Sequence, residues 1–429
     1  MIPPFMLVNK KFVIIGILIL ALTVGFTVLW FMNREKPPSL KPVTLEYWGI
    51  NEPESAMNVL IGEYKKSRPN ITINYSDRQF DDDLVRYRAT LLSRLKETTG
   101  PSIFRIHSTW VSKYFSELAS SRGELSNASS YKNRFYQIAY DECSSSTGEI
   151  YCVPLEYDGL VLLYNLNVFN QAGLQKPVTW EDIRSHAIKL TIRNGDTISR
   201  GGLALGTALN VSNSTDVFGL MLAQSGVSIP GGLDTDAAFA ALTFYRDFAS
   251  KDRVWSSSMQ NSTLAFSTEK VAMIFAKKAD IKKILSINPT LKFGVAEVPQ
   301  LPGIDGKIKQ KDWASLWVEA VSADLDEDQK NAAWDFLNWL SQPDQQKMLF
   351  AETLKSDKTG YVYSDKSLKP ELKDIPYLFT LAESAPYANT SFITDNSGND
   401  NYSQALKAAI DSGSDPMTDL KVVKAVLSK

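Results

Sequence analysis

The chain has few of the residues on which most enzyme chemistry depends. Its 429 residues include only 2 histidines, His107 and His186, and 2 cysteines, Cys143 and Cys152. The patterns H-E-x-x-H, G-x-S-x-G and C-x-x-C do not occur, so a zinc hydrolase, a hydrolase triad and a dithiol redox centre have no recognisable signature. We therefore predict a protein that is not an enzyme and that has no catalytic residues, metal site or cofactor. A glycosidase stays open as an alternative, because its paired carboxylates are recognised only by their separation in space.

An excess of charge of one sign is also lacking. The 46 basic and 48 acidic residues give a formal net charge of −2, and both signs are interspersed along the chain. A nucleic-acid-binding surface needs a concentrated basic field, so we predict no nucleic-acid partner. The hydrophobic content of 44% is enough for more than one core. Because domains usually contain about 100 to 200 residues, we expect two lobes, and we expect the chain to be monomeric.

Long hydrophobic runs are absent except for one near the N-terminus. Residues 12–32 contain no charged side chain, and as a helix they match a hydrocarbon core of about 30 Å. The run ends without an A-x-A-like cleavage site, and no cysteine near its end could carry a lipid. We therefore predict a cytoplasmic tip and transmembrane signal anchor over residues 1–36, with the helix at 12–32, followed by a proline-rich linker at 37–42.

The two cysteines bear on which side of the membrane the folded part lies. Basic residues flank the hydrophobic run on both sides, so they do not fix its orientation. Cys143 and Cys152 bracket a short segment with Gly148 that reads as a hairpin tip, which makes them a disulfide candidate in an oxidising compartment. Two reduced thiols in a cytosolic protein are the alternative. We favour a single-pass protein of the cell membrane whose folded part is extracytoplasmic.

Strand and helix periodicities alternate after residue 43. Leu45 and Tyr47 predict a strand, residues 57–64 predict a helix, and residues 71–75 again have the period of two. The same alternation continues through helical spacing at 84–95, an apolar strand at 103–106, and Thr179, which we expect to cap a helix. Such alternation predicts an α/β protein with a largely parallel, helix-covered sheet.

Three stretches in this order resemble the family 1 extracellular solute-binding proteins of ABC importers, the maltose-binding-protein-like group. They are PLEYDGLVLLYNLNVFNQAGLQKPVTWEDI at Pro154–Ile183, LAFSTEKVAMIFAKKADI at Leu264–Ile281, and NAAWDFLNWLSQPDQQKML at Asn331–Leu349. The resemblance runs from about residue 43 to the C-terminus. It implies a two-lobed periplasmic-binding-protein-like fold of type II with hinge-crossing strands, which closes on a ligand by hinge motion.

The resemblance also predicts how the chain is divided between the lobes. We expect lobe 1 to contain residues 43–156 and 299–335, and lobe 2 to contain residues 158–297 and 345–429. The chain is expected to cross between them near 155–159, near 298–299, and within the helix that contains Trp334. The predicted hinge residues are Glu156, Tyr157, Gly159 and Pro299.

Aromatic rings beside carboxylates and amides are what a sugar-binding cleft requires. Such residues follow the ends of the predicted parallel strands, where open α/β sheets place ligands, and others match family contact positions. The predicted ligand-binding residues are Trp48, Asn51, Glu52, Ser108, Thr109, Trp110, Asp158, Trp313, Ser315, Trp317 and Tyr361. Structural alternatives are open for several of them: packing for Trp48 and Trp110, helix capping for Ser108 and Thr109, a solvated acid at Glu52, and a local ion pair at Asp158.

The sequence thus predicts a membrane-anchored receptor that captures a carbohydrate by closing its lobes and delivers it to the permease subunits of an ABC importer. Lobe closure would be a population shift driven by a ligand that contacts both lobes. The lipid bilayer would be contacted through residues 12–32. A peptide, polyamine or metal ligand, or a role as a sensor module, are the alternatives that the sequence leaves open.

Overall fold

A computed structural model describes residues 41–78, 84–97, 100–303, 305–394 and 400–428. The predicted transmembrane helix at 12–32 and most of the predicted linker lie outside these residues. Within the described ranges, no helix has both the length and the apolar character needed to cross a membrane. The chain from Val43 to Lys429 forms a compact unit of its own.

The larger of its two sheets has the strand order β11-β4-β10-β3-β1-β2, with β12 beside β10. β1, β2 and β3 are mutually parallel, whereas β10 is antiparallel to both β3 and β4. The carboxyl ends of β1, β3 and β4 therefore meet the start of β10 at one edge of this sheet. The strands are β1 Val43–Gly49, β2 Ile71–Asp77, β3 Ile103–His107, β4 Cys152–Gly159, β10 Asp312–Val321, β11 Val362–Tyr363 and β12 Ala388–Asn389.

Helices cover the larger sheet because each has one apolar face. In α2, the helical spacing predicted from Met57, Leu60 and Tyr64 is confirmed, and all three side chains are buried. The helices of this layer are α2 Glu54–Ser67, α3 Leu84–Arg94, α4 Ala128–Arg134, α5 Gln137–Cys143, α12 Glu327–Leu340, α13 Pro343–Thr353 and α14 Pro376–Ser384, with the 3-10 turns η1 Ser108–Lys113, η2 Phe115–Glu117, η3 Gly123–Ser126, η4 Lys366–Leu372 and η5 Ala385–Tyr387.

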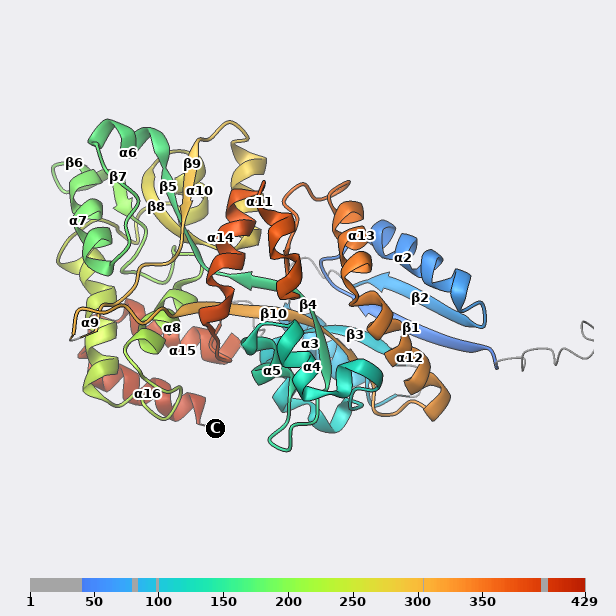
Figure 1. Ribbon diagram of the computed structural model, residues 1–429. Helices are drawn as coiled ribbons and strands as arrows, with labels where there is room; N and C mark the ends of the chain where they lie inside the picture. The colour runs from blue at the N-terminus through green and yellow to red at the C-terminus, as the bar shows by residue number, and fades with distance from the viewer. Residues whose placement is uncertain (1–40, 79–83, 98–99, 304, 395–399, 429) are drawn as a thin grey trace, which may run out of the picture. The chain divides into compact units, whose positions relative to one another are not determined.

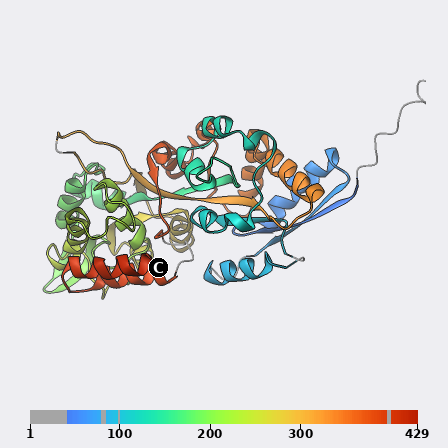
Figure 2. The ribbon, with the colours of Figure 1, turned by 90° about the horizontal axis from the view of Figure 1, so that it is seen from below.

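The smaller sheet has the strand order β6-β7-β8-β5-β9. Thr179 caps α7 as predicted, in a reciprocal capping box with Asp182. Figure 2 shows the C-terminal helices in red beside the green helices of this layer. The strands are β5 Val161–Asn165, β6 Ile192–Asn194, β7 Thr197–Leu203, β8 Val271–Ala276 and β9 Phe293–Ala296, and the helices are α6 Leu166–Ala172, α7 Trp180–Leu190, α8 Ser214–Gln224, α9 Asp236–Ser250, α10 Ser262–Ser267, α11 Lys278–Ile287, α15 Asp400–Asp411 and α16 Pro416–Leu427.

The chain passes from one sheet to the other at three places. β4 leads into β5 through Leu160, and β9 of the smaller sheet is followed by β10 of the larger one (Figure 1). The third passage follows α14, where the chain leaves β12 and enters α15. The expected third crossing, in the helix containing Trp334, is not observed. α12 packs on β1 instead, because Trp334, Phe336 and Leu337 are buried in the core of the larger sheet.

The C-terminal third of the chain is also divided differently from the sequence-based expectation. Residues 345–429 were all expected in lobe 2, but α13 packs on α2 and β11 pairs with β4, so both belong to the larger sheet. The apolar side chains of Leu349, Phe350 and Val362 join the larger core, which fixes this placement. α15 and α16 pack on α8 and α9 of the smaller layer. The remaining lobe boundaries stay a prediction.

Candidate functional site

A cavity of about 510 Å³ lies between the two layers. The larger layer, which is the larger sheet with its helices, contributes η1, α5, β10 and β12 to the wall. The smaller layer, which is the smaller sheet with its helices, contributes the end of α8 and the turn that follows it. Two further cavities, of about 480 and 670 Å³, are each lined by elements of one layer only. The residues lining the cavity between the layers are Thr109, Ser112, Lys113, Glu142, Ala223, Gly226, Val227, Ser228, Ile229, Lys311, Trp313, Asn389, Thr390, Ser391 and Phe392.

Trp313 is one of the predicted ligand-binding residues that the structure places in this wall. Its indole Nε1 donates a hydrogen bond to Oδ1 of Asp216, at 2.9 Å, so an α8 residue fixes the orientation of a β10 side chain. The ring lies against Gly219, where an added Cβ would be 2.5 Å from a ring carbon. Only 1% of Trp313 is exposed, so most of its ring is packed against the protein and little of it faces the cavity.

Thr109 is the other predicted residue in the wall. It follows β3 within η1, and its Oγ1 lies 2.8 Å from Nδ1 of His107. Burial, together with the charge of nearby Lys277, lowers the pKa of His107 to about 3, so the imidazole is neutral at physiological pH. Ser108, next in the chain, is buried, and its Oγ accepts a hydrogen bond from the Leu316 amide at 3.3 Å. Ser108 therefore joins η1 to β10 and does not line the cavity.

The charged residues of the wall are Lys113, Glu142 and Lys311. Burial raises the pKa of Glu142 to about 7; neighbouring Asp141 raises it too, and a hydrogen bond with Ser108 opposes the shift. Desolvation lowers the pKa of both lysines. The two lysines were not predicted from the sequence as site residues, although Lys113 lies in the same 3-10 turn, η1, as Thr109. Nothing in the sequence places Glu142 or Lys311 beside it.

Glu52 and Glu156 do not reach this cavity, because both bind the same buried guanidinium. Arg105 in β3 forms ion pairs with Glu52 and, at 2.8 Å, with Glu156, while Glu319 lies 3.7 Å from its Nε. Burial raises the pKa of Glu319 to about 8, and Arg105 opposes that shift. The alternative of a solvated acid at Glu52 is wrong, since only 3% of this residue is exposed.

Asp158 lies at the end of β4, opposite Ser315 in β10. Its Oδ1 accepts a hydrogen bond from the Lys278 amide at the start of α11, at 3.3 Å. Burial raises the pKa of Asp158 to about 6, although nearby Lys277 and Lys278 lower it. Lys278 also forms an ion pair with Glu156 at 2.7 Å. The end of β4 is thus joined to the smaller layer by one amide and one ammonium group.

Most of the other predicted aromatic residues are packed in the larger core. Trp110 is fully buried; its ring centroid lies 6.4 Å from that of Trp317, which stands edge-on to His107 at 5.3 Å. Tyr361 is buried against Phe350 at 5.3 Å. For Trp110 the packing alternative therefore describes this structure.

Two further predicted residues lie at the end of β1, with Trp48 inside the strand and Asn51 just after it. Trp48 is covered by the Arg78 guanidinium, 4.3 Å from its ring centroid. Asn51 is exposed, with a positive φ of 61°. Neither residue lines the cavity. Ligand contact by the predicted residues stays a prediction.

The predicted hinge residues surround the first two passages between the sheets. Tyr157 is buried beside Tyr136, with ring centroids 5.8 Å apart. Gly159 leaves no room for a side chain, since a Cβ would be 2.9 Å from the Tyr157 hydroxyl. The Pro299 carbonyl accepts a hydrogen bond from Gln224 Nε2 at 2.8 Å. Their role as a hinge is not tested by this geometry.

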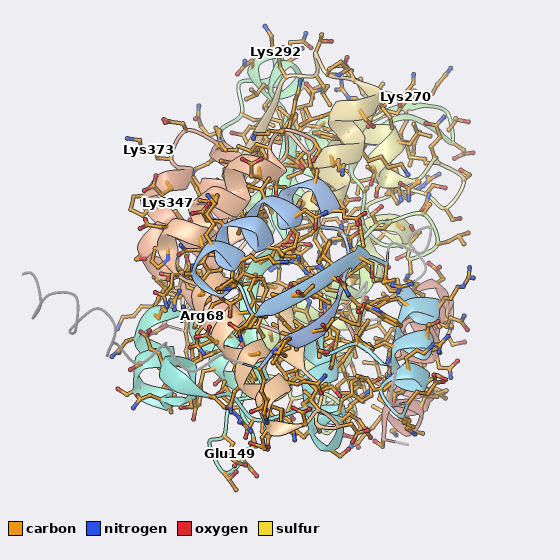
Figure 3. The ribbon with its side chains drawn as sticks, turned by 90° about the vertical axis from the view of Figure 1, so that its right-hand side faces the viewer. Arg68, Glu149, Lys270, Lys292, Lys347 and Lys373 are labelled. Atoms are coloured by element: carbon orange, nitrogen blue, oxygen red, sulfur yellow. A yellow bond between two sulfur atoms is a disulfide. The ribbon has the colours of Figure 1, made fainter. Side chains whose placement is uncertain are left out.

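Cys143 and Cys152 form a disulfide, with their Cα atoms 5.3 Å apart. This is the predicted pairing. It joins the end of α5 to the start of β4, and the loop between them carries Glu149, which points away from the body of the protein (Figure 3). The disulfide fixes the position of α5, whose Glu142 lines the cavity.

The sequence matches the family model described as bacterial extracellular solute-binding protein over residues 60–362. A putative binding protein from Brucella abortus (strain 2308) is 22% identical over 289 residues, which are 66% of this chain and 67% of the relative.

Solved structures share the arrangement of the two sheets. One is an ABC substrate-binding protein from Listeria monocytogenes in complex with cycloalternan, with a TM-score of 0.66, 20% identity, and coverage of 90% of this chain and 98% of that one. The cyclic alpha-maltosyl-1,6-maltose binding protein from Arthrobacter globiformis has a TM-score of 0.71 at 20% identity and the same coverage. UgpB from Mycobacterium tuberculosis, in complex with glycerophosphocholine, has a TM-score of 0.68 at 18% identity, again covering 90% and 98%.

At this level of identity the solved structures show the fold, which is the two-lobed α/β fold of periplasmic-binding-protein-like receptors. The family match covers well over half of the chain, and the sequence motifs, the two sheets and the cavity between them agree with it. The chain belongs to the bacterial extracellular solute-binding protein family.

Proposed function

We propose that this protein is a membrane-anchored extracytoplasmic receptor that captures a carbohydrate between its lobes and presents it to the permease subunits of an ABC importer. The observation that carries the proposal is the cavity of about 510 Å³ whose wall is built from both layers. A ligand that contacts both layers binds the closed form more tightly than the open form, which is the differential affinity that lobe closure requires.

The polar groups of the cavity suit a saccharide. Hydroxyl and amide side chains from both layers line it, including Ser112, Ser228 and Asn389, and Trp313 and Phe392 add aromatic surface. Groups that both donate and accept hydrogen bonds match sugar hydroxyls, and ring edges and faces match the apolar C–H surface of a pyranose.

Binding without turnover is part of the proposal. Glu142 is the one carboxylate among the described residues that line the cavity. A glycosidase requires two carboxyl groups about 5 to 9 Å apart on either side of the scissile bond. The cavity therefore supports a receptor better than a glycoside-processing enzyme.

A thermal-shift screen of the full-length chain in detergent tests the ligand class. Saccharides of different length form the main panel, with peptides, polyamines and ferric iron as the competing classes. A ligand at about 100 times its Kd adds about 2.7 kcal/mol to the free energy of unfolding, which raises the melting temperature measurably. We expect stabilisation by a saccharide. Stabilisation only by members of the other classes would contradict the carbohydrate assignment and leave the receptor fold in place.

The anchor has its own test. Residues 12–32 have the length and composition of a membrane-spanning helix, so we expect the full-length chain to stay in the membrane fraction after an alkaline wash. Introducing Leu20→Arg and Val24→Arg adds about 2.5 to 3.5 kcal/mol of insertion cost for each charge, and should release the protein. Release of the unchanged chain by the alkaline wash would contradict the anchor.

A further inference from the structure

The charges of the cavity differ from those that the sequence led us to expect. Acidic residues, Glu52 and Asp158, were predicted at the ligand, but Glu52 is paired with Arg105 and Asp158 accepts from the Lys278 amide. Neither lines the cavity. Among the described residues of the wall, the charged ones are instead Lys113, Lys311 and Glu142, which gives this part of the wall a positive balance.

Lys113 stands at the larger layer's side of the cavity, against two aromatic rings. Its Nζ lies 5.3 Å from the ring centroid of Phe392 and 5.0 Å from that of Tyr402. Among the described residues no carboxylate forms an ion pair with it, and its side chain is exposed to solvent. Aromatic faces hold an ammonium group in place by cation–π attraction and leave its positive charge available to a ligand.

Lys311 contributes a second ammonium group from the segment that leads into β10. Its Nζ donates to the carbonyl of Ala223 in α8, at 2.5 Å, and it forms no ion pair with a described carboxylate. An ammonium group has three donors, so this bond leaves others for a ligand. Nearby Lys309 adds to the positive field.

The single acid of the wall opposes this field only weakly near neutral pH. Burial raises the pKa of Glu142 to about 7, so a large fraction of this side chain is uncharged there. Partial desolvation lowers the pKa of Lys113 and Lys311 because it disfavours their charged forms. An anion placed beside the two ammonium groups would stabilise those charged forms.

We infer that the ligand is a saccharide bearing a negatively charged group, a carboxylate or a phosphate, held by Lys113 and Lys311 in the cavity between the layers. This inference rests on the proposed function and specifies its substrate class. A neutral saccharide would leave both ammonium groups partly desolvated without a counter-ion, whereas an anionic one satisfies them with charge-assisted hydrogen bonds.

Matched sugars measure the contribution of the anionic group. Titration calorimetry on the full-length chain compares glucose with glucuronate and glucose 6-phosphate, and galactose with galacturonate. A hydrogen bond to a charged group usually changes affinity by about tenfold or more, so we expect the anionic member of a pair to bind at least about tenfold more tightly than the neutral one. The carboxylate and phosphate arms show which anion is preferred.

Substitutions assign that preference to the cavity. Lys113→Met should reduce the difference between the members of a pair, and Lys113→Arg should retain it. Lys373→Met should leave the difference unchanged, because Lys373, labelled in Figure 3, is an exposed lysine that does not line the cavity. Raising the ionic strength should weaken binding of the anionic member more than that of the neutral one. Lys311→Met should reduce the preference independently of Lys113.

The outcomes separate this inference from the proposed function. Equal or tighter binding of the neutral sugars overturns the anionic ligand and leaves the carbohydrate receptor standing, as does an anionic preference that Lys113→Met and Lys311→Met do not change. Binding of inorganic phosphate or acetate as tight as that of the charged sugars supports the cationic site and overturns the saccharide. Failure of every sugar in both panels overturns the proposed function and this inference with it.

Discussion

At the scale of single residues, Asp312 is one of the buried carboxyl groups that should make the stability of the fold depend on pH. It is buried at the start of β10, where it accepts a hydrogen bond from the Trp313 amide at 2.7 Å. Burial raises its pKa from the ordinary 3.8 to about 7, so the folded chain keeps a proton that the unfolded chain has lost. The stability that this group contributes is complete below the unfolded pKa and is lost as pH rises through about 7.

Asp312→Asn removes that titration and keeps the acceptor for the Trp313 amide. Between about pH 5 and about pH 8, the free energy of unfolding of the wild type should fall by roughly 2 to 3 kcal/mol relative to that of the variant. Denaturant unfolding of both proteins at the two pH values measures this difference. If the free energies of unfolding of the two proteins differ by the same amount at both pH values, Asp312 does not titrate in this range.

Of the residues predicted to bind the ligand, the structure places Thr109 and Trp313 in the cavity wall, and ligand contact by either of them stays a prediction. Thr109 and Trp313 line the cavity because one follows the end of β3 and the other begins the neighbouring strand β10. Position in the chain also predicted that Trp110 and Glu52 lie near strand ends. It did not predict where their side chains point, because that depends on contacts with residues distant in sequence, such as Trp317 and Arg105. Lys311 and Glu142 line the cavity because of tertiary contacts, which no local sequence pattern predicts.

At the scale of elements, Lys278 holds the start of α11 to β4. Its ammonium group binds Glu156 at 2.7 Å, and the two side chains are only 16% and 6% exposed. Lys278→Met leaves Glu156 with the guanidinium of Arg105 alone, and the loss of a partner for a buried charge should cost about 1 to 3 kcal/mol in the free energy of unfolding.

Lys282, one turn further along α11, supplies the matched control. It pairs with Asp357 at 2.9 Å, but its side chain is 60% exposed. Lys282→Met should therefore cost less than about 1 kcal/mol. Chemical unfolding of the two variants gives the comparison, and equal losses would mean that burial does not strengthen the contact between α11 and β4.

Strands and helices themselves were largely readable from sequence. The period of two in β1 and β2, the helical spacing of α2 and the Thr179 cap of α7 are local patterns, and the structure confirms each of them. The assignment of α13 and β11 to a sheet is different in kind. Both elements have apolar faces that fit either layer, and only the packing of Leu349 and Phe350 into the larger core decides between them.

At the scale of the whole molecule, the feature that would join ligand binding to lobe closure is the cavity lined by both layers. Ser112 and Ser116 allow it to be blocked with a matched control. Both serines are exposed and lie four residues apart in adjacent 3-10 turns, but only Ser112 lines the cavity. An indole at position 112 fills space that the ligand needs, whereas an indole at position 116 leaves the cavity open.

The measurement that tests the central claim most directly is calorimetric titration of the full-length chain with its best saccharide, for the wild type, Ser112→Trp and Ser116→Trp. We predict that Ser112→Trp lowers affinity by about 100-fold or more, equivalent to about 2.8 kcal/mol, while Ser116→Trp binds as the wild type does. Undiminished binding by a folded Ser112→Trp protein would contradict capture of the solute in the cavity between the two sheets.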